Sequence, residues 1–236
     1  MSSLAWPHCA TDQADNMQTQ IKICEIASLA EARLAMDAGA DALGFVCARP
    51  KSPRTIDERL VAEIAPRIPQ TITTYLLTSE LTARGIVDHV ERTGTSAVQI
   101  LAPINAEESR LLPRLLPGIR LVQVIHVEDE SALEHIERYA PDVDAFLLDS
   151  GKPMSPTPEY GGTGRTHDWS VSAEFVRRSP LPVALAGGLT PVNVREAIES
   201  VRPHSVDVYS GVRTLGALDQ EKLSEFVHAV RSAEEM

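Results

Sequence analysis

The sequence predicts a single-domain (β/α)8 TIM barrel, a fold of the α/β class. Short apolar runs alternate with amphipathic stretches along the chain, and eight of each can be counted. The length of 236 residues suits one such barrel, since these domains typically reach ~250 residues. A doubly wound sheet is the alternative. It rarely needs eight units, and it usually carries a glycine fingerprint after its first strand, where this chain has Cys24, Glu25 and Ile26.

The expected strands are short and nearly continuous in apolar residues, as a parallel sheet buried on both faces requires. They cover residues 21–26, 42–47, 72–77, 97–101, 121–125, 145–149, 183–187 and 206–210. Between them, apolar residues recur at helical spacing. The clearest helical patterns span residues 29–40, 56–68, 130–140, 192–201 and 219–230. Polar residues stand where helix N-caps or first-turn acids are expected, and these are Ser28, Asp57, Asp129 and Asp219.

The barrel is expected to occupy residues 20–236, preceded by an extension over residues 1–19. That extension lacks the basic and then apolar order of a secretory signal, and we expect it to be flexible. No Gly/Ser-rich linker or repeat boundary divides the remaining chain. These features together predict one domain.

Composition and charge exclude several classes of partner. The formal net charge is −11 with no cluster of basic residues, which argues against binding to nucleic acid. No apolar run approaches the ~20 residues that would cross a bilayer. The three cysteines form no CxxC pair, so neither a disulfide framework nor a zinc site is expected. We therefore expect a cytoplasmic protein without a metal, acting on a small molecule as a monomer or homodimer.

In barrels of this kind the chemistry lies at the carboxyl ends of the strands. Cys24 ends the first expected strand and Asp149 ends the sixth. Strand alternation places Lys22 on the same face as Cys24, so its charge can lower the pKa of the thiol and make it a usable base. A free cysteine is also a common buried residue. An aspartate that ends an apolar run, in contrast, is costly unless it is paired or used.

Glycines follow the last three strands, where the loops of this fold commonly bind phosphate. These residues are Gly162 and Gly164 within the long loop 150–169, Gly187 and Gly188 after the seventh strand, and Gly211, beside Ser210, after the eighth. Tight turns into helices would also use glycines. Their recurrence at these loops favours a phosphate cradle. In the same long loop, we interpret His167 and Asp168 as loop and helix-cap residues rather than metal ligands.

Several motifs, in order and at barrel spacing, resemble the phosphoribosylanthranilate isomerase family of tryptophan biosynthesis. They are IKIC, ADALGFV, KSPR, FLLDS, YGGTGRTHDWS, LAGGLTPVNVREAI and VRPHSVDVYSGV. The resemblance covers the chain from about Ile21 to the C-terminal helix. It implies an Amadori rearrangement of an aminoaldose phosphate to a 1-amino-1-deoxyketose phosphate, without a cofactor.

The same resemblance implies roles for individual residues. Asp149 is the acid that protonates the furanose ring oxygen, and Cys24 is the base that removes the C2 proton. Arg54 is expected near the carboxylate of the aminobenzoate, where a guanidinium can bind it bidentately. Gly187, Gly188, Ser210 and Gly211 match the family's phosphate cradle. Lys22, Gln99 and Asp207 are the other residues expected at the substrate.

The chain departs from the family pattern in strand three, which reads TYLLTSE, after Gln99 in strand four, and at two single positions. Glu25 stands where glycine usually follows the cysteine, and Arg213 stands where glutamate usually follows SGV. Three hypotheses are therefore open: an authentic phosphoribosylanthranilate isomerase, a divergent paralogue that isomerises another phosphoribosylated amine, and a non-catalytic barrel that binds a phosphometabolite or a protein.

Overall fold

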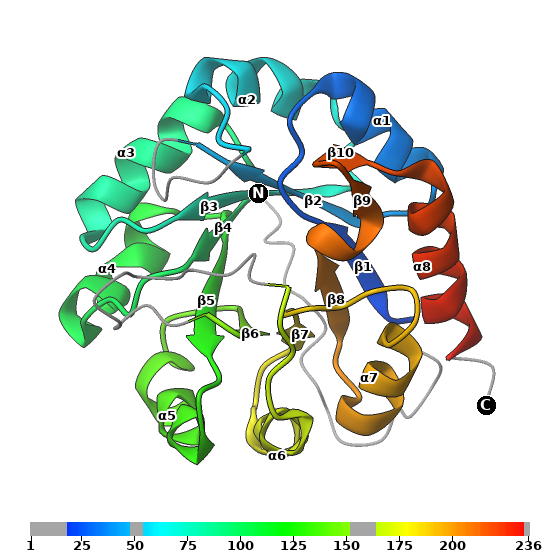
Figure 1. Ribbon diagram of the computed structural model, residues 1–236. Coiled ribbons are helices and arrows are strands. Elements are labelled where there is room, and N and C mark those ends of the chain that lie inside the picture. Colours follow the sequence, from blue (N-terminus) through cyan, green and yellow to red (C-terminus); the bar gives the residue numbers. More distant parts are fainter. Residues whose placement is uncertain (1–17, 48–53, 152–163, 234–236) are drawn as a thin grey trace.

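The computed structural model describes residues 18–47, 54–151 and 164–233. Eight parallel strands form a closed barrel in chain order, with β1 hydrogen-bonded to both β2 and β8 (Figure 1). The predicted TIM barrel is therefore confirmed. An open doubly wound sheet is excluded because the first and last strands pair.

Each strand of the barrel falls on one of the apolar runs expected from the sequence. The strands are β1 (Gln20–Ile23), β2 (Ala42–Val46), β3 (Thr73–Thr78), β4 (Ala97–Ile100), β5 (Arg120–His126), β6 (Ala145–Asp149), β7 (Val183–Leu185) and β8 (Ser205–Val208). The first strand ends earlier than expected. The amide of Cys24 still donates to Val208 O at 2.9 Å, but Glu25 has a φ of +56° and turns the chain away.

Helices surround the barrel and cover its outer face (Figure 1). They are α1 (Leu29–Asp37), α2 (Glu58–Ile64), α3 (Ala83–Thr93), α4 (Ala106–Leu115), α5 (His135–Tyr139), α6 (Trp169–Arg178), α7 (Val194–Val201) and α8 (Gln220–Ser232). Ser28, Asp57 and Asp219 are N-caps whose side chains accept from first-turn amides. These three predictions are confirmed. None of the described helices is long and apolar enough to cross a membrane.

Two of the expected helices are interrupted. Residues 130–140 divide into a 3₁₀ turn, η2 (Glu130–Glu134), and the short α5. Asp129 caps the 3₁₀ turn, and its side chain accepts from the amide of Ser131. Residues 56–68 end in a 3₁₀ turn, η1 (Ala65–Arg67). Pro66 lies in that turn and has no N–H with which to continue the α-helix.

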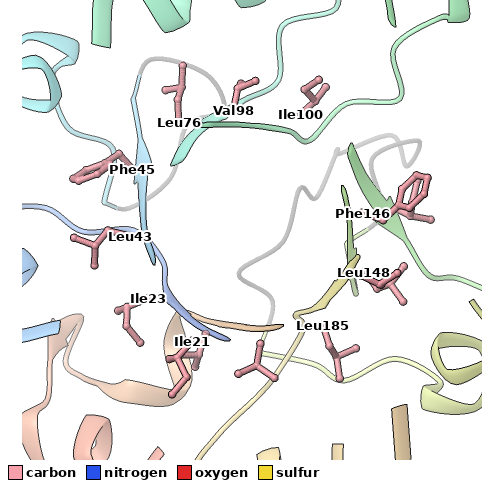
Figure 2. Packing of buried hydrophobic residues seen from close by; sticks show 14 of the residues in the cluster. Ile21, Ile23, Leu43, Phe45, Leu76, Val98, Ile100, Phe146, Leu148 and Leu185 are labelled. Carbon is pink, nitrogen blue, oxygen red and sulfur yellow. The ribbon is translucent and has the colours of Figure 1, made fainter. Parts of the chain in front are cut away.

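Strand alternation produces two separate apolar clusters. The larger lies between the barrel and the helices, and Figure 2 shows side chains such as Phe45 and Phe146 pointing outward from the strands. Cys47 belongs to this outer cluster. The smaller cluster fills the barrel interior and contains Cys24 together with Leu147. The two cysteines therefore face opposite sides of the barrel wall.

A short hairpin follows the last strand of the barrel. After β8 come a 3₁₀ turn, η3 (Ser210–Val212), and the antiparallel pair β9 (Arg213–Thr214) and β10 (Ala217–Leu218). The hairpin lies near β1 and α1 in Figure 1. It brings a segment from the end of the chain beside the segment that follows the first strand.

Candidate active site at the barrel mouth

Lys22 links the thiol of Cys24 to a carboxylate from the far end of the chain. Its Nζ lies 2.8 Å from Asp207 Oδ2 and 3.4 Å from Cys24 Sγ, and all three residues are buried. β1 and β8 pair in parallel with Lys22 opposite Asp207, so barrel closure creates the ion pair. Lys22 and Cys24 share a face as the strand alternation predicted, and the pairing of Lys22 with Asp207 adds a contact that the sequence did not indicate.

The environment keeps the sulfur protonated and the lysine charged. Burial, followed by the charge of Asp207, raises the pKa of Cys24 to about 12, although Lys22 acts in the opposite direction. Burial alone would lower the pKa of Lys22, but the charges of Asp207 and Cys24 more than offset this, so it is raised. Lys22 favours the thiolate, but burial opposes it and the charge of Asp207 outweighs that of Lys22. The lowered thiol pKa expected from the sequence is therefore not found, because burial and Asp207 act on the same sulfur.

Gly44 in the middle of β2 makes room for this cluster. A Cβ at this position would lie 3.0 Å from Cys24 Sγ and 3.1 Å from Lys22 Nζ. Glycine weakens a strand interior. Its presence here is explained by packing, because a side chain would take the space of the thiol and the ammonium. Both atoms that a methyl group would meet are ends of movable side chains.

We expect Gly44→Ala to fold normally and to lower kcat up to about 10-fold. At these distances the thiol and the ammonium must move by a few tenths of an ångström, and a displacement of ~1 Å can cost ~10²-fold. The measurement is steady-state turnover together with thermal unfolding. Gly85→Ala in α3 is the matched control, since its Cβ would lie equally close, 3.0 Å, to Oε2 of the half-buried Glu80, which is not part of the Lys22 cluster. An unchanged kcat in Gly44→Ala would contradict the claim that the thiol is tightly packed against residue 44.

Asp149 is the second titratable group at the mouth. It ends β6 with 9 % exposure, and its Oδ1 accepts from the amide of Ser150 at 2.7 Å. Burial raises the pKa of Asp149 to about 6; the charge of Asp207 adds to this, while the Ser150 amide and Lys22 oppose it. Such a carboxyl is still partly protonated near neutral pH and can donate a proton.

The glycines of the expected phosphate cradle come together across three loops. A Cβ on Gly164 would lie 3.8 Å from Ser210 Oγ, and one on Gly187 would lie 3.2 Å from the amide N of Ser150. The loops after β6, β7 and β8 therefore adjoin. Gly162 lies outside the described residues.

Two of these glycines allow backbone segments to approach closely. A Cβ on Gly188, whose φ is +63°, would lie 2.5 Å from the carbonyl carbon of Arg165. One on Gly211 would lie 2.0 Å from Leu189 O. No side chain fits at either position without backbone movement. The glycines thus have a steric role, while phosphate binding by them stays a prediction.

His167 and Asp168 have local roles at the start of α6. Asp168 is the N-cap and its side chain accepts from the amide of Ser170. His167 Nε2 lies 2.7 Å from Ser172 Oγ. Burial lowers the pKa of His167 to about 4, so the ring is neutral near pH 7. These contacts agree with the interpretation as loop and cap residues.

Arg54 lies at the mouth but is already engaged by the protein. Its guanidinium donates to Gly216 O at 2.6 Å, to Glu25 O at 3.3 Å and to a carboxylate oxygen of Glu31. Arg213 contacts the same three residues from the other side. Glu31, which contacts both arginines, was not identified from the sequence. Its only sequence feature is that of an acidic residue in the first turn of a helix.

Gln99 lies away from the mouth, in the barrel interior. It lines a cavity of about 50 Å³ together with Lys22, Tyr75 and Asp207. The same cavity reaches residues at the strand starts, such as Gln20 and Ser205. Gln99 Oε1 is buried without a hydrogen-bond partner among the described residues. A substrate contact by Gln99 stays a prediction. The cavity that Gln99 lines extends from the Lys22–Asp207 pair toward the starts of the strands, away from the mouth.

Comparison with known proteins gives consistent results. Residues 21–229 match the family N-(5'phosphoribosyl)anthranilate (PRA) isomerase. The chain is 35% identical to N-(5'-phosphoribosyl)anthranilate isomerase of Methanocella arvoryzae over 214 residues, which covers 90% of this chain and 98% of that one.

Solved structures show the same likeness. Monomers of dimeric phosphoribosylanthranilate isomerase from Thermotoga maritima superpose with a TM-score of 0.76 at 28% identity, covering 91% of this chain and 100% of theirs. Phosphoribosyl anthranilate isomerase in complex with reduced 1-(o-carboxyphenylamino)-1-deoxyribulose 5-phosphate superposes with a TM-score of 0.76 at 29% identity, with the same coverage of 91% and 100%.

Proposed function

Because the chain belongs to the N-(5'-phosphoribosyl)anthranilate isomerase family, we propose that Cys24 and Asp149 carry out the acid–base chemistry of that isomerisation. The protein is an intramolecular aldose–ketose isomerase of tryptophan biosynthesis, the first of the three hypotheses drawn from the sequence. The observation that supports the residue assignment is the pairing of a buried thiol beside a lysine with a buried carboxyl of raised pKa at one barrel mouth.

The proposed reaction begins with two proton transfers. Asp149 donates its proton to the furanose ring oxygen while the bond from that oxygen to C1 breaks, and the nitrogen lone pair forms the Schiff base. The Cys24 thiolate then removes the proton from C2, and the electrons of the C–H bond form an enolamine. Tautomerisation of the enolamine gives the ketone: the Cys24 thiol returns a proton to C1, and the C2 hydroxyl gives its proton to Asp149, so both groups recover their starting states. The overall change is an isomerisation, so no oxidant or reductant is needed.

The remaining residues are assigned to binding. We place the substrate phosphate at the loops that carry Gly164, Gly187, Gly188 and the Ser210–Gly211 pair, because these loops adjoin where this fold commonly binds phosphate. The aromatic carboxylate is assigned to Arg54. That carboxylate would compete with Glu31 for the guanidinium, and a planar guanidinium can bind a carboxylate bidentately.

The direct test is turnover of N-(5'-phosphoribosyl)anthranilate by the purified protein, followed by chromatographic measurement of substrate and product. We expect conversion to the 1-deoxyribulose phosphate product, and growth without tryptophan when the chain is expressed in a strain that lacks the isomerase. A protein that leaves the substrate unconsumed for hours and does not complement that strain would contradict the proposal.

The pKa values of the acid and the base predict an unusual pH profile. Between about 6, the raised pKa of Asp149, and about 12, the raised pKa of Cys24, the pair holds one proton, mostly on sulfur. In the reactive arrangement that proton lies on Asp149 and the sulfur is a thiolate. Both arrangements hold one proton, so the fraction of molecules in the reactive arrangement does not change with pH in this range. Below pH about 6 the pair gains a second proton and the thiolate fraction falls. We therefore expect kcat/KM to be flat above pH about 6 and to decrease below it. A kcat/KM that decreases as pH rises through 6 to 8 would contradict the assignment.

We further propose a cytoplasmic location, supported by the free thiols of Cys24 and Cys47. The oligomeric state stays a prediction of monomer or homodimer. The relative from Thermotoga maritima is dimeric, and light scattering of the purified protein distinguishes the two states.

A further inference from the structure

Arg213 is tied to the backbone of the segment that follows the thiol. Its Nη2 donates to Cys24 O at 3.0 Å and to Glu25 O at 2.9 Å. Its side chain is 3 % exposed, and the guanidinium lies 5.2 Å from the ring centre of Tyr209. A planar guanidinium can bond two neighbouring carbonyls at once, whereas the ammonium of a lysine is a point donor.

The segment held in this way has an unfavourable backbone conformation. Glu25 has a φ of +56°, in the left-handed region that is unfavourable for a residue with a side chain. Glycine adopts this region at little cost. Glu25 follows Cys24 directly, so relaxation of Glu25 would rotate the peptide that carries the thiol residue.

A carboxylate on α1 fixes the other end of the same segment. Glu31 Oε2 accepts from the amide of Ala27 at 3.1 Å, and both its oxygens lie 3.5 Å from Arg213 Nη1. Arg213 also reaches Gly216 O at 3.3 Å. The turn of residues 24–27 is therefore held between a helix near the start of the chain and a hairpin near its end.

We propose that Arg213 is a positioning residue for the Cys24 thiol, and that it does so by stabilising the left-handed conformation of Glu25. This inference rests on the proposed role of Cys24 as the base. Arg213 acts through the backbone and does not contact Sγ. Through Arg213, the hairpin after β8 helps to position the residue that ends strand β1.

The coupling between Arg213 and Glu25 gives a specific test. Arg213→Met removes both carbonyl contacts, and we expect kcat to fall roughly 10- to 100-fold because the thiol shifts. KM should change less, since Arg54 keeps its own bonds to Gly216 and Glu31. The double variant Arg213→Met/Glu25→Gly should recover most of that loss, since glycine adopts the turn without help. Arg213→Lys keeps the charge, and its kcat should lie between those of the unaltered protein and Arg213→Met. All rates are measured well below the unfolding temperature of each variant.

Arg231→Met is the matched control. Arg231 also donates to a backbone carbonyl, that of Thr19 at 2.7 Å, and contacts the carboxylate of Asp41, but it does so at the start of β1. Its loss should lower stability and leave kcat within about twofold, as expected for a surface pair. A similar fall in kcat for both arginine variants would overturn the proposal.

A second measurement does not need turnover. The alkylation rate of Cys24, followed for its peptide by mass spectrometry, should change in Arg213→Met and return toward the original rate in the double variant. Unchanged alkylation and unchanged kcat in Arg213→Met would overturn the positioning role, as would a lowered kcat that Glu25→Gly does not restore. If the unaltered protein lacks turnover, the proposed reaction fails, and alkylation alone decides the role of Arg213.

Discussion

Asp149→Asn and Cys24→Ser should each lower kcat on the order of 10³-fold, because general acid or base catalysis typically contributes ~10²–10⁴-fold. An asparagine amide cannot protonate the ring oxygen, and a serine hydroxyl is a far weaker acid than a thiol and yields too little of its anion. Both replacements preserve side-chain size. The fold should therefore be retained, and KM should change much less than kcat.

The measurement is steady-state kinetics together with circular dichroism for each variant. Asp129→Asn and Cys47→Ser are the matched controls, since Asp129 caps a surface turn and Cys47 faces the outer cluster. Both controls should keep kcat within about twofold. If Asp149→Asn retained full kcat, ring opening would not depend on this carboxyl, and the acid would have to be sought elsewhere.

Lys22→Met should have the second largest effect, on both stability and activity. Removal of one member of a buried ion pair leaves the other charge unpaired and typically costs ~3–5 kcal/mol, and here Asp207 would remain in the barrel interior. The pKa of Cys24 should rise further, because Lys22 is the neighbour that lowers it. We expect a lower urea midpoint and a kcat decrease of at least ~10-fold, since thiolate formation becomes less favourable.

The double variant Lys22→Met/Asp207→Asn separates these two effects. Removal of both charges should restore much of the stability, because neutral replacement of a buried pair is often tolerated. Activity should return only in part: loss of the Asp207 charge favours the thiolate, but no ammonium then lies beside the sulfur. Recovery of kcat in step with stability would mean that Lys22 is structural only.

The barrel could be read from the sequence because its signals are local. Each apolar run became a strand, and Ser28, Asp57 and Asp219 cap helices as expected, since a cap depends only on residues two or three positions away. The alternation of Lys22 and Cys24 in one strand also predicted their shared face.

The contacts that complete the site are between residues distant in sequence, and no pattern indicates them. Arg213 bonds the carbonyl of Cys24 from 189 residues away, and its position in a hairpin reveals nothing of that partner. The left-handed conformation of Glu25 was not predicted, because glutamate itself carries no signal for it; the glycine that usually follows the cysteine in the family was the available sign. Gln99 was expected at the substrate, but its depth in the barrel depends on strand tilt and register, which a periodic pattern does not carry.

The pairing of Lys22 with Asp207 also has a consequence for synthesis of the chain. Strand β1 leaves the ribosome early, and its lysine stays without this partner until β8 follows, 185 residues later. A nascent chain that ends before β8 holds the thiol and Asp149 but cannot close the barrel. The active site is therefore among the last parts of the molecule to form, so incomplete chains should be devoid of isomerase activity even when most of the strands are present.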